Sequence, residues 1–235
     1  MRTIDLSAPL VADSIWRTIL IRSEDDLGSI RAELEKTLNT LDADIERMEH
    51  QTGSGRLIDT LFLHLVVRWL RPSTVVEVGT YIGKTATAMM TGMIESGAEN
   101  PQLFTCDRNS PFFLKEQSFG SNIVGFPYTE GTQMFEKLVA DGVSADLLYI
   151  DGRVGDMDLP LIDKLCRDDT FVMVDDYAGV EKGVVNIMML NRLSHFDRYF
   201  LVEPVTRQLA SELGFFGCGH TAMLIPNGAV RLATQ

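Results

Sequence analysis

Cysteine is scarce in this chain: only Cys106, Cys166 and Cys218 occur among 235 residues. Their odd number and wide spacing fit neither a disulfide framework nor a zinc site, both of which need closely matched cysteines. We therefore expect three reduced thiols packed in the core of a cytoplasmic protein.

The sequence also lacks a long apolar run and an amino-terminal signal pattern. Its most apolar stretch, residues 61–70, is too short to span a bilayer and is interrupted by His64 and Arg68. We expect a soluble protein with no membrane partner. For His64, inside an apolar helical pattern, we expect a packed core histidine.

Positive charge is in short supply. The chain has 21 lysines and arginines against 33 aspartates and glutamates, a formal net charge of −12. Such a balance opposes binding to a nucleic-acid backbone and favours a small-molecule substrate or a protein partner. An apolar fraction of 45% is enough for one sizeable core.

The most informative stretch is residues 75–85. Valines at 75, 76 and 78 surround Glu77 and predict a buried parallel strand. Gly79 and Gly83 then mark a sharp turn into a helix, where a ligand can approach bare backbone and the unpaired N–H groups of the helix N-terminus. This turn is expected to be a ligand site.

Two common phosphate-binding motifs are absent from that turn. A P-loop needs four residues between its first glycine and Gly-Lys-Thr, but Gly79 and Gly83 enclose only three. A dinucleotide fingerprint needs a second glycine where Tyr81 stands. What remains is an acid, one residue, a glycine, three residues and a second glycine.

Strand and helix patterns alternate along the rest of the chain. This alternation predicts an α/β fold, a doubly wound, mostly parallel seven-stranded sheet whose last strand inserts antiparallel. We expect an N-terminal helical extension over residues 1–54 and an α/β domain over 55–235. The expected strands are 75–78, 103–107, 123–128, 145–150, 170–174, 199–203 and 220–225, and the expected helices are 23–48, 57–70, 84–94, 133–140, 159–166 and 180–193.

The N-terminal extension contains one clear amphipathic helix, over residues 23–48. Its apolar residues recur at steps of three and four from Leu27 to Met48. Such a stripe must pack either on the α/β domain, as a lid, or on a second copy of itself, as the contact of a homodimer. Residues 1–23 show no clear period.

Acidic residues stand at the ends of three expected strands. Asp107 ends one strand, Asp151 is followed by Gly152 after another, and a third ends in Asp-Asp-Tyr over residues 175–177. The carboxyl ends of parallel strands meet at one edge of a sheet, so these acids are expected to face the ligand. The two oxygens of Asp107 can accept hydrogen bonds from both hydroxyls of a ribose.

The glycine turn, Asp107, the Tyr-Ile-Asp-Gly segment at 149–152 and the Val-Asp-Asp-Tyr segment at 174–177 together resemble the class I S-adenosylmethionine (SAM) dependent methyltransferases of the small-molecule O-methyltransferase type. The resemblance covers roughly residues 55–226. It implies a Rossmann-like fold, SAM as cofactor and a small-molecule acceptor. It also implies that Gly79 and Gly83 hold the methionine end, that Glu77 orders the turn or meets the amino group, and that Asp107 holds the ribose. Further cofactor contacts are expected at Thr80, Tyr81, Gly131, Thr132 and Asp151.

The metal-dependent relatives bind magnesium through two aspartates and an asparagine, and Asp151, Asp175 and Asp176 occupy those positions. Oxygen-only ligands suit such a hard cation. Two departures count against the same mechanism: Asp176 replaces the asparagine, and Val154 stands where the relatives carry a lysine close to the acceptor. A metal-free alternative, in which Asp175 or Asp176 caps the next helix and the other acid binds substrate, stays open.

Three functions follow from the resemblance. The first is methyl transfer to an acceptor bound over Asp151, Asp175, Asp176 and Tyr177. The second, known among some relatives, is closure of SAM on itself to azetidine-2-carboxylate with release of methylthioadenosine, in which the face of Tyr177 would support the sulfonium. The third is a non-catalytic SAM-binding dimer that works through the helix at 23–48.

Overall fold

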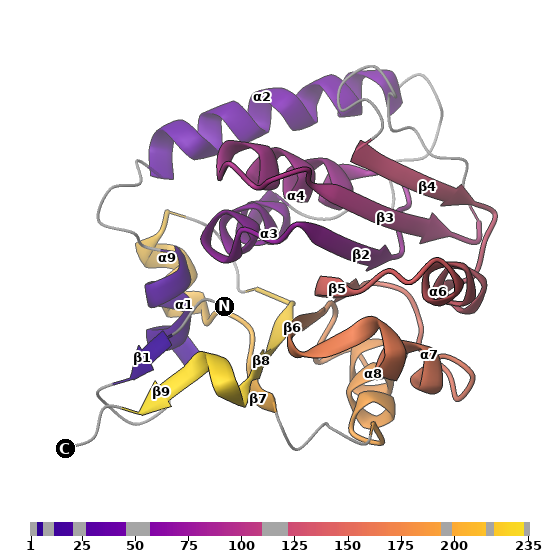
Figure 1. Cartoon of the computed structure of the whole chain (residues 1–235). Helices are drawn as coiled ribbons and strands as arrows, with labels where there is room; N and C mark the ends of the chain where they lie inside the picture. The colour runs from indigo at the N-terminus through magenta and orange to yellow at the C-terminus, as the bar shows by residue number, and fades with distance from the viewer. Residues whose placement is uncertain are drawn as a thin grey trace.

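A seven-stranded sheet forms the centre of the protein in a computed structural model of the chain (Figure 1). The structure describes residues 4–6, 12–20, 27–45, 57–109, 122–193, 199–214 and 219–232. Across the sheet the strands are β4 (Ile123–Pro127), β3 (Gln102–Asp107), β2 (Thr74–Val78), β5 (Ala145–Ile150), β6 (Cys166–Val174), β8 (Ala222–Pro226) and β7 (Tyr199–Val202). β8 runs antiparallel to both of its neighbours, and the other strand pairs of this sheet are parallel, which confirms the predicted Rossmann-like sheet with an antiparallel last strand.

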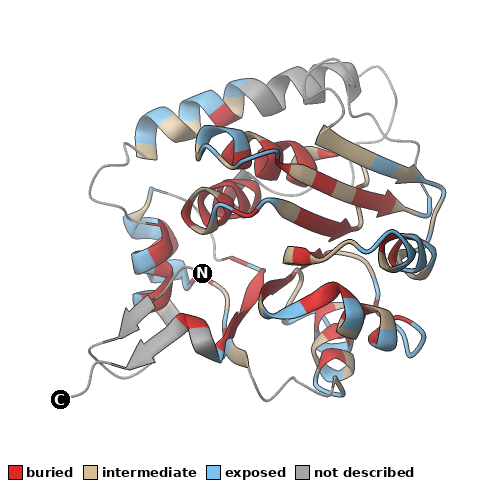
Figure 2. Ribbon diagram, viewed as in Figure 1, coloured by how far each residue is buried: buried red, intermediate tan, exposed pale blue. Residues whose placement is uncertain are grey.

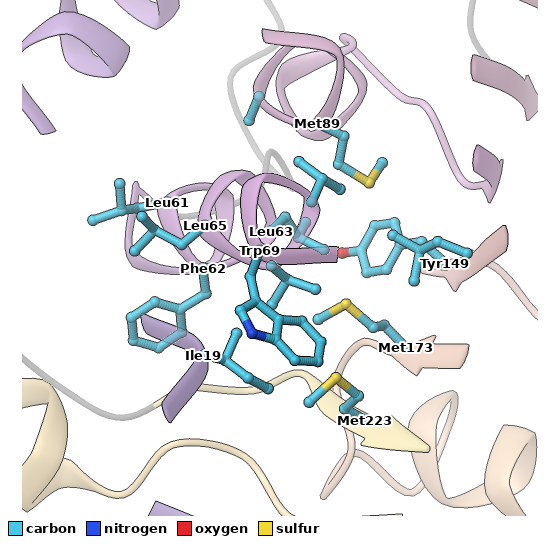
Figure 3. Close-up of a cluster of buried hydrophobic side chains, with 14 of the residues drawn as sticks. Ile19, Leu61, Phe62, Leu63, Leu65, Trp69, Met89, Tyr149, Met173 and Met223 are labelled. Atoms are coloured by element: carbon cyan, nitrogen blue, oxygen red, sulfur yellow. The ribbon is translucent and has the colours of Figure 1, made fainter. Parts of the chain in front are cut away.

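Helices cover both faces of this sheet, as a doubly wound fold requires. On one face lie α3 (Leu57–Leu70), α4 (Lys84–Glu95) and α2 (Leu27–Ile45), and on the other α6 (Gly131–Ala140), α7 (Leu159–Leu165) and α8 (Gly183–Leu190). Because side chains alternate along a strand, Val75 packs into the first core and Val76 into the second. Figure 2 shows that the central strands and helix α3 are largely buried, whereas the edge strand β4 and helix α6 are more exposed. Figure 3 shows part of the first core around Trp69.

The pair α3 and α4 packs unusually closely behind the glycine turn. A Cβ atom at Gly92 would lie 2.5 Å from the Val67 side chain and 2.6 Å from the His64 carbonyl. His64 itself is buried, with Nδ1 3.0 Å from the Ala88 carbonyl oxygen, and burial lowers its pKa. The expectation of a packed core histidine is confirmed.

A helix that sequence analysis missed, α1 (Ala12–Leu20), belongs to the same core. Its Trp16 stacks on Phe62 with ring centroids 6.2 Å apart, and the indole Nε1 donates to the Glu203 carbonyl at 2.7 Å. It also contacts the short helix α9 (Arg207–Glu212), since the Thr206 hydroxyl donates to Asp13 at 2.6 Å. This part of the N-terminal extension is therefore integrated with the α/β domain.

The predicted amphipathic helix corresponds to α2, whose first half packs on its own domain. Leu34 is buried, and Leu27 and Ile30 pack against the first core. The side chains of the second half, the helix ends predicted at residues 23 and 48 and the predicted boundary at residue 54 lie outside the described residues. The dimer contact stays a prediction.

A second, two-stranded sheet pairs β1 (Ile4–Leu6) in parallel with β9 (Val230–Leu232), which follows the 3-10 turn at Asn227–Ala229. Over the described part of the chain, every helix is too short or too polar to cross a membrane.

Candidate ligand-binding cleft

A cleft of about 490 Å³ opens at the carboxyl ends of β2, β3 and β5. This is the edge at which open α/β sheets bind ligands, and the volume falls within the roughly 300–1,000 Å³ usual for small-molecule sites. Its described lining residues are Val78, Gly79, Cys106–Asn109, Thr129–Thr132, Asp151–Arg153, Gly155–Asp158 and Lys182.

The glycine turn brings two strand ends together in this cleft. Gly79 has a φ of +102°, which favours glycine, and a Cβ atom there would lie 3.0 Å from backbone atoms of Asp151 and Gly152. The N–H groups of Gly79 and Thr80 both donate to the Cys106 carbonyl, at 2.9 and 3.0 Å. Glycine is thus required for the close approach of β2 and β5, and the turn is fastened to β3.

Glu77 supports the turn from below. Its carboxylate is fully buried and accepts hydrogen bonds from the hydroxyls of Thr85 on α4 and Thr105 on β3. Burial raises the Glu77 pKa to about 7, although the two hydroxyl hydrogen bonds act to lower it. Of the two roles expected for Glu77, these contacts favour ordering of the turn. The Thr80 hydroxyl adds to the same network through a hydrogen bond with the Thr105 hydroxyl.

Asp107 lies at the end of β3 and lines the cleft, beside the glycine turn as the sequence predicted. Its Oδ2 accepts from the Tyr81 N–H and its Oδ1 from the Asn109 N–H, both at 2.8 Å. Tyr81 adopts a positive φ of 46°, and this hydrogen bond holds its backbone. Each carboxylate oxygen can accept more than one hydrogen bond, so the arrangement is compatible with a ribose.

The start of α6 forms a further part of the cleft wall. Gly131 and Thr132 line the cleft, and the Thr132 hydroxyl donates to Asp158 Oδ1 at 2.5 Å. The other oxygen of Asp158 accepts from the Gly155 N–H at 2.7 Å. Asp158 therefore joins α6 to the loop after β5 and fixes the width of the cleft on this side.

The acids at the ends of β5 and β6 surround an unpredicted cation, Lys182. Its Nζ contacts Asp151 directly and lies 3.0 Å from Asp176 and 3.7 Å from Asp175. Asp175 also accepts from the Thr221 hydroxyl at 2.9 Å. The predicted gathering of three aspartates is present, with an ammonium among them.

One ammonium group lies among three carboxyl groups here, and the pKa values of Asp151 and Lys182 are both shifted. Burial and the charge of Asp175 raise the pKa of Asp151 well above its usual range, although Lys182 acts to lower it. Burial by itself lowers the pKa of Lys182, but the attraction of Asp151 and hydrogen bonds to Asp151 and Asp176 raise it above its ordinary value. The pKa of Asp151 is raised mainly by burial, and the pKa of Lys182 is raised by its contacts with the acids.

The described residues do not fit a magnesium ion as they stand. No group of three or more His, Cys, Asp or Glu side chains within the described ranges is arranged to hold a metal ion. The aspartates instead direct their oxygens at Lys182. The binding of magnesium stays a prediction.

In the metal-free alternative, the expected capping of the next helix by Asp175 or Asp176 is wrong, whereas the absence of a metal and the binding of substrate by the other acid stay predictions. The residue at the N-cap of α8 is Lys182, with no side-chain cap hydrogen bond. The backbone of the acidic segment is held differently, since the Tyr177 N–H donates to the His220 carbonyl at 2.9 Å. The segment also contains a left-handed residue, Asp176, with a φ of +51°.

Five of the predicted site residues line the cleft: Gly79, Asp107, Gly131, Thr132 and Asp151. The others lie behind or beside the described lining, namely Glu77, Thr80, Tyr81, Gly83, Asp175, Asp176 and Tyr177. Gly83, with a φ of +84°, is the N-cap of α4 and acts through the shape of the turn. The predicted residues therefore gather at one edge of the sheet, five of them in the described wall of the cleft, and their contacts with a ligand stay a prediction.

Two site residues were missed, Lys182 and Asn186. The resemblance pointed to a lysine at a fixed spacing after Asp151, whereas Lys182 stands at the N-cap of α8, far along the chain. Asn186 is fully buried on α8 and holds the loop after β5 by two hydrogen bonds. A lone amide among apolar helix residues was the available signal, because buried polar groups need partners.

The cysteines behave as the sequence predicted where they are described. Cys106 and Cys166 are buried, and burial raises the pKa of each thiol to about 12. A thiol with such a pKa is not a nucleophile near neutral pH, so Cys106 contributes shape to the cleft. Cys218 lies outside the described residues.

No protein-family model matches the chain, and no curated protein matches it. Its fold is nevertheless shared with solved O-methyltransferase structures at low identity. A putative O-methyltransferase from Klebsiella pneumoniae is 15% identical, with a TM-score of 0.59 over 92% of this chain and 96% of that one. The O-methyltransferase from Bacillus cereus, in complex with S-adenosylhomocysteine (SAH), is 14% identical, with a TM-score of 0.55 over 91% and 96%. TomG from Streptomyces achromogenes, an O-methyltransferase in complex with SAM, is 14% identical, with a TM-score of 0.52 over 92% and 96%. The chain thus has the class I methyltransferase fold.

Proposed function

We propose that this protein transfers the methyl group of SAM to a small-molecule acceptor. One observation carries the proposal: a single cleft joins Gly79, Asp107 and Asp151 at the carboxyl ends of three adjacent strands. The fold around that cleft is shared with O-methyltransferases whose structures contain SAM or SAH.

The residues of the cleft suit the three parts of SAM. The bare backbone at Gly79 can approach the methionine part, and the Asp107 carboxylate can accept hydrogen bonds from the ribose hydroxyls. The N-terminus of α6 at Gly131 would then lie toward the base. Asp151, whose backbone lies next to Gly79, would place negative charge near the positive sulfonium, an attraction that strengthens in a partly desolvated site.

Bound SAM supplies a methyl group already activated by its sulfonium. The contribution of the chain is therefore mainly to position an acceptor in line with that methyl group and to exclude water, effects that can supply much of a rate enhancement. The ring closure of SAM has less support, because Tyr177, whose face was expected to support the sulfonium, is not among the described lining residues of the cleft.

Calorimetric titration of the purified chain with SAM and with SAH tests the first step. We expect both to bind, and we expect Lys137→Ala, an exposed change on the outer side of α6, to leave binding unchanged. If neither compound binds at millimolar concentration, the proposal is wrong.

A second experiment separates methyl transfer from its alternatives. The protein is incubated with SAM, with and without a mixture of phenols, hydroxy acids and amines, and the products are identified by mass spectrometry. SAH that appears only when an acceptor is present supports methyl transfer. Methylthioadenosine well above the no-enzyme control would instead support ring closure, and binding without either product would support a non-catalytic SAM-binding protein.

A further inference from the structure

We propose that the ammonium of Lys182 takes the place of a divalent cation among Asp151, Asp175 and Asp176, so that this site works without a metal ion. The inference concerns the acidic cluster alone and does not depend on the proposed methyl transfer.

The contacts of Lys182 are those of a shared counterion. Nζ contacts Asp151 and lies 3.0 Å from Asp176 and 3.7 Å from Asp175. An ammonium has three donors, and three carboxylates without any cation would repel one another. Lys182 is also largely shielded from solvent, with its side chain 23% exposed, so its charge is screened less than that of a surface lysine.

The backbone holds Lys182 in this position. A Cβ atom at the next residue, Gly183, would lie 2.0 Å from the Asp176 carbonyl oxygen and 2.7 Å from the Tyr177 Cα. Only glycine allows α8 to begin directly against the acidic segment. The Gly179 N–H binds the same Asp176 carbonyl at 2.6 Å, so the loop that delivers the lysine is fastened to the strand end that supplies two of the acids.

A divalent cation and this lysine exclude each other. Magnesium needs about six oxygen ligands, several of them from water, and the ammonium is already in contact with the carboxylate oxygens that such an ion would need. A tethered ammonium also offers no open coordination position. If the proposed methyl transfer is correct, the acceptor is therefore not one that must be chelated through two oxygens, as a catecholate is by a metal.

Removal of the lysine should convert the cluster into a metal site. We expect calorimetry with Mg²⁺ and Mn²⁺ at constant ionic strength to give no binding to the wild-type chain at millimolar concentration. Lys182→Ala should bind at least one of the two ions roughly tenfold or more tightly than the weakest binding that the wild-type titration could detect, because the three carboxylates lose their counterion. Adding Asp151→Asn to that variant should abolish the gain, and Lys137→Ala, which removes an exposed lysine beside Asp141, should behave as wild type.

Two results would overturn the proposal. One is divalent-ion binding by the wild-type chain that is lost in Asp151→Asn, since Lys182 would then yield to a metal. The other is a folded Lys182 variant that binds no divalent ion. Lys182→Met, which keeps the apolar stem without the charge, replaces Lys182→Ala if circular dichroism shows that the alanine variant is unfolded. These titrations contain no SAM, so their failure is distinguishable from a failure of the proposed function.

Discussion

The side-chain amide of Asn186 is bonded to the backbone of Gly152: its Nδ2 donates to the Gly152 carbonyl at 2.8 Å. Its Oδ1 accepts from the Val154 N–H at 2.9 Å. Asn186 lies on α8 and is fully buried, whereas Gly152 and its neighbour Asp151 line the cleft. One helix thus supplies both the lysine that contacts Asp151 and the amide that fixes the loop after it.

Asn186→Ala should lower the free energy of unfolding by about 1–3 kcal/mol, because the Gly152 carbonyl and the Val154 N–H lose their partner in a buried place. Urea denaturation measures the change. The matched control is Asn191→Ala, at the exposed C-cap of the same helix, which should change stability by less than about 0.5 kcal/mol. Equal stabilities for the two variants would contradict the positioning role of Asn186.

Gly79→Ala should be more damaging than its backbone conformation alone explains. A positive φ costs a non-glycine residue about 1–2 kcal/mol, and here the new Cβ also lies 3.0 Å from the backbone of Asp151 and Gly152. We expect the free energy of unfolding to fall by about 2–5 kcal/mol in total, and we expect SAH binding to be lost.

Gly142→Ala separates the two effects. Gly142 has a φ of +71°, and no described atom lies within 4 Å of a Cβ placed there. The Gly142→Ala variant should therefore have a free energy of unfolding about 1–2 kcal/mol lower than wild type, and it should retain SAH binding. If Gly79→Ala and Gly142→Ala lose the same stability and both bind SAH, close approach at Gly79 has no role.

Glu77→Gln should change how stability depends on pH. The pKa of Glu77 is about 7 in the folded chain against an ordinary 4.5, because the carboxyl is buried. Between these values the folded state holds a proton that the unfolded state has released, so the free energy of unfolding falls as pH rises from about 4.5 to about 7. The full loss is about 3 kcal/mol, and it stays constant at higher pH.

Glutamine cannot ionise but can still accept and donate at Thr85 and Thr105, so Glu77→Gln should lack this slope. In urea denaturation between pH 4.5 and 8, the free energy of unfolding of the variant should rise relative to that of wild type as the pH rises. Glu136→Gln, an exposed change on α6, serves as control. A difference between Glu77→Gln and wild type that does not vary with pH would rule out a raised pKa at Glu77.

Much of the fold was predictable because its signals are local. The run from Val75 to Val78 reads as a buried strand, and the acids at its neighbours' ends locate the cleft edge through topology alone. The helix α1 was missed although Ile15, Trp16, Ile19 and Leu20 have helical spacing, since a window over residues 1–23 averages this short pattern with its surroundings. The helix α9 has only six residues and too few turns to show a period.

The contents of the site were harder to predict because they depend on distances between elements. Spacing from Asp151 pointed to residue 154, which the structure shows to be a buried valine, while the cation comes from a residue 31 positions along the chain. Similarly, the sequence shows that Asp107 ends a strand but not that its carboxylate holds the Tyr81 N–H. Residues that are distant in the sequence and come into contact only in the folded chain leave no local pattern in the sequence.

Asp107→Ala should weaken SAH binding by about 1–3 kcal/mol, since a charged hydrogen-bond acceptor is lost. The carboxylate also orders the turn at Tyr81, so weaker binding alone does not establish contact with the ribose. The decisive measurement is a cycle that compares wild type and Asp107→Ala, each titrated with SAH and with its 2′-deoxy analogue. If Asp107 binds that hydroxyl, the two changes should be non-additive, because each removes the same hydrogen bond. If the losses add, Asp107 acts only through the turn, and the hydroxyl must be held by another group in the cleft.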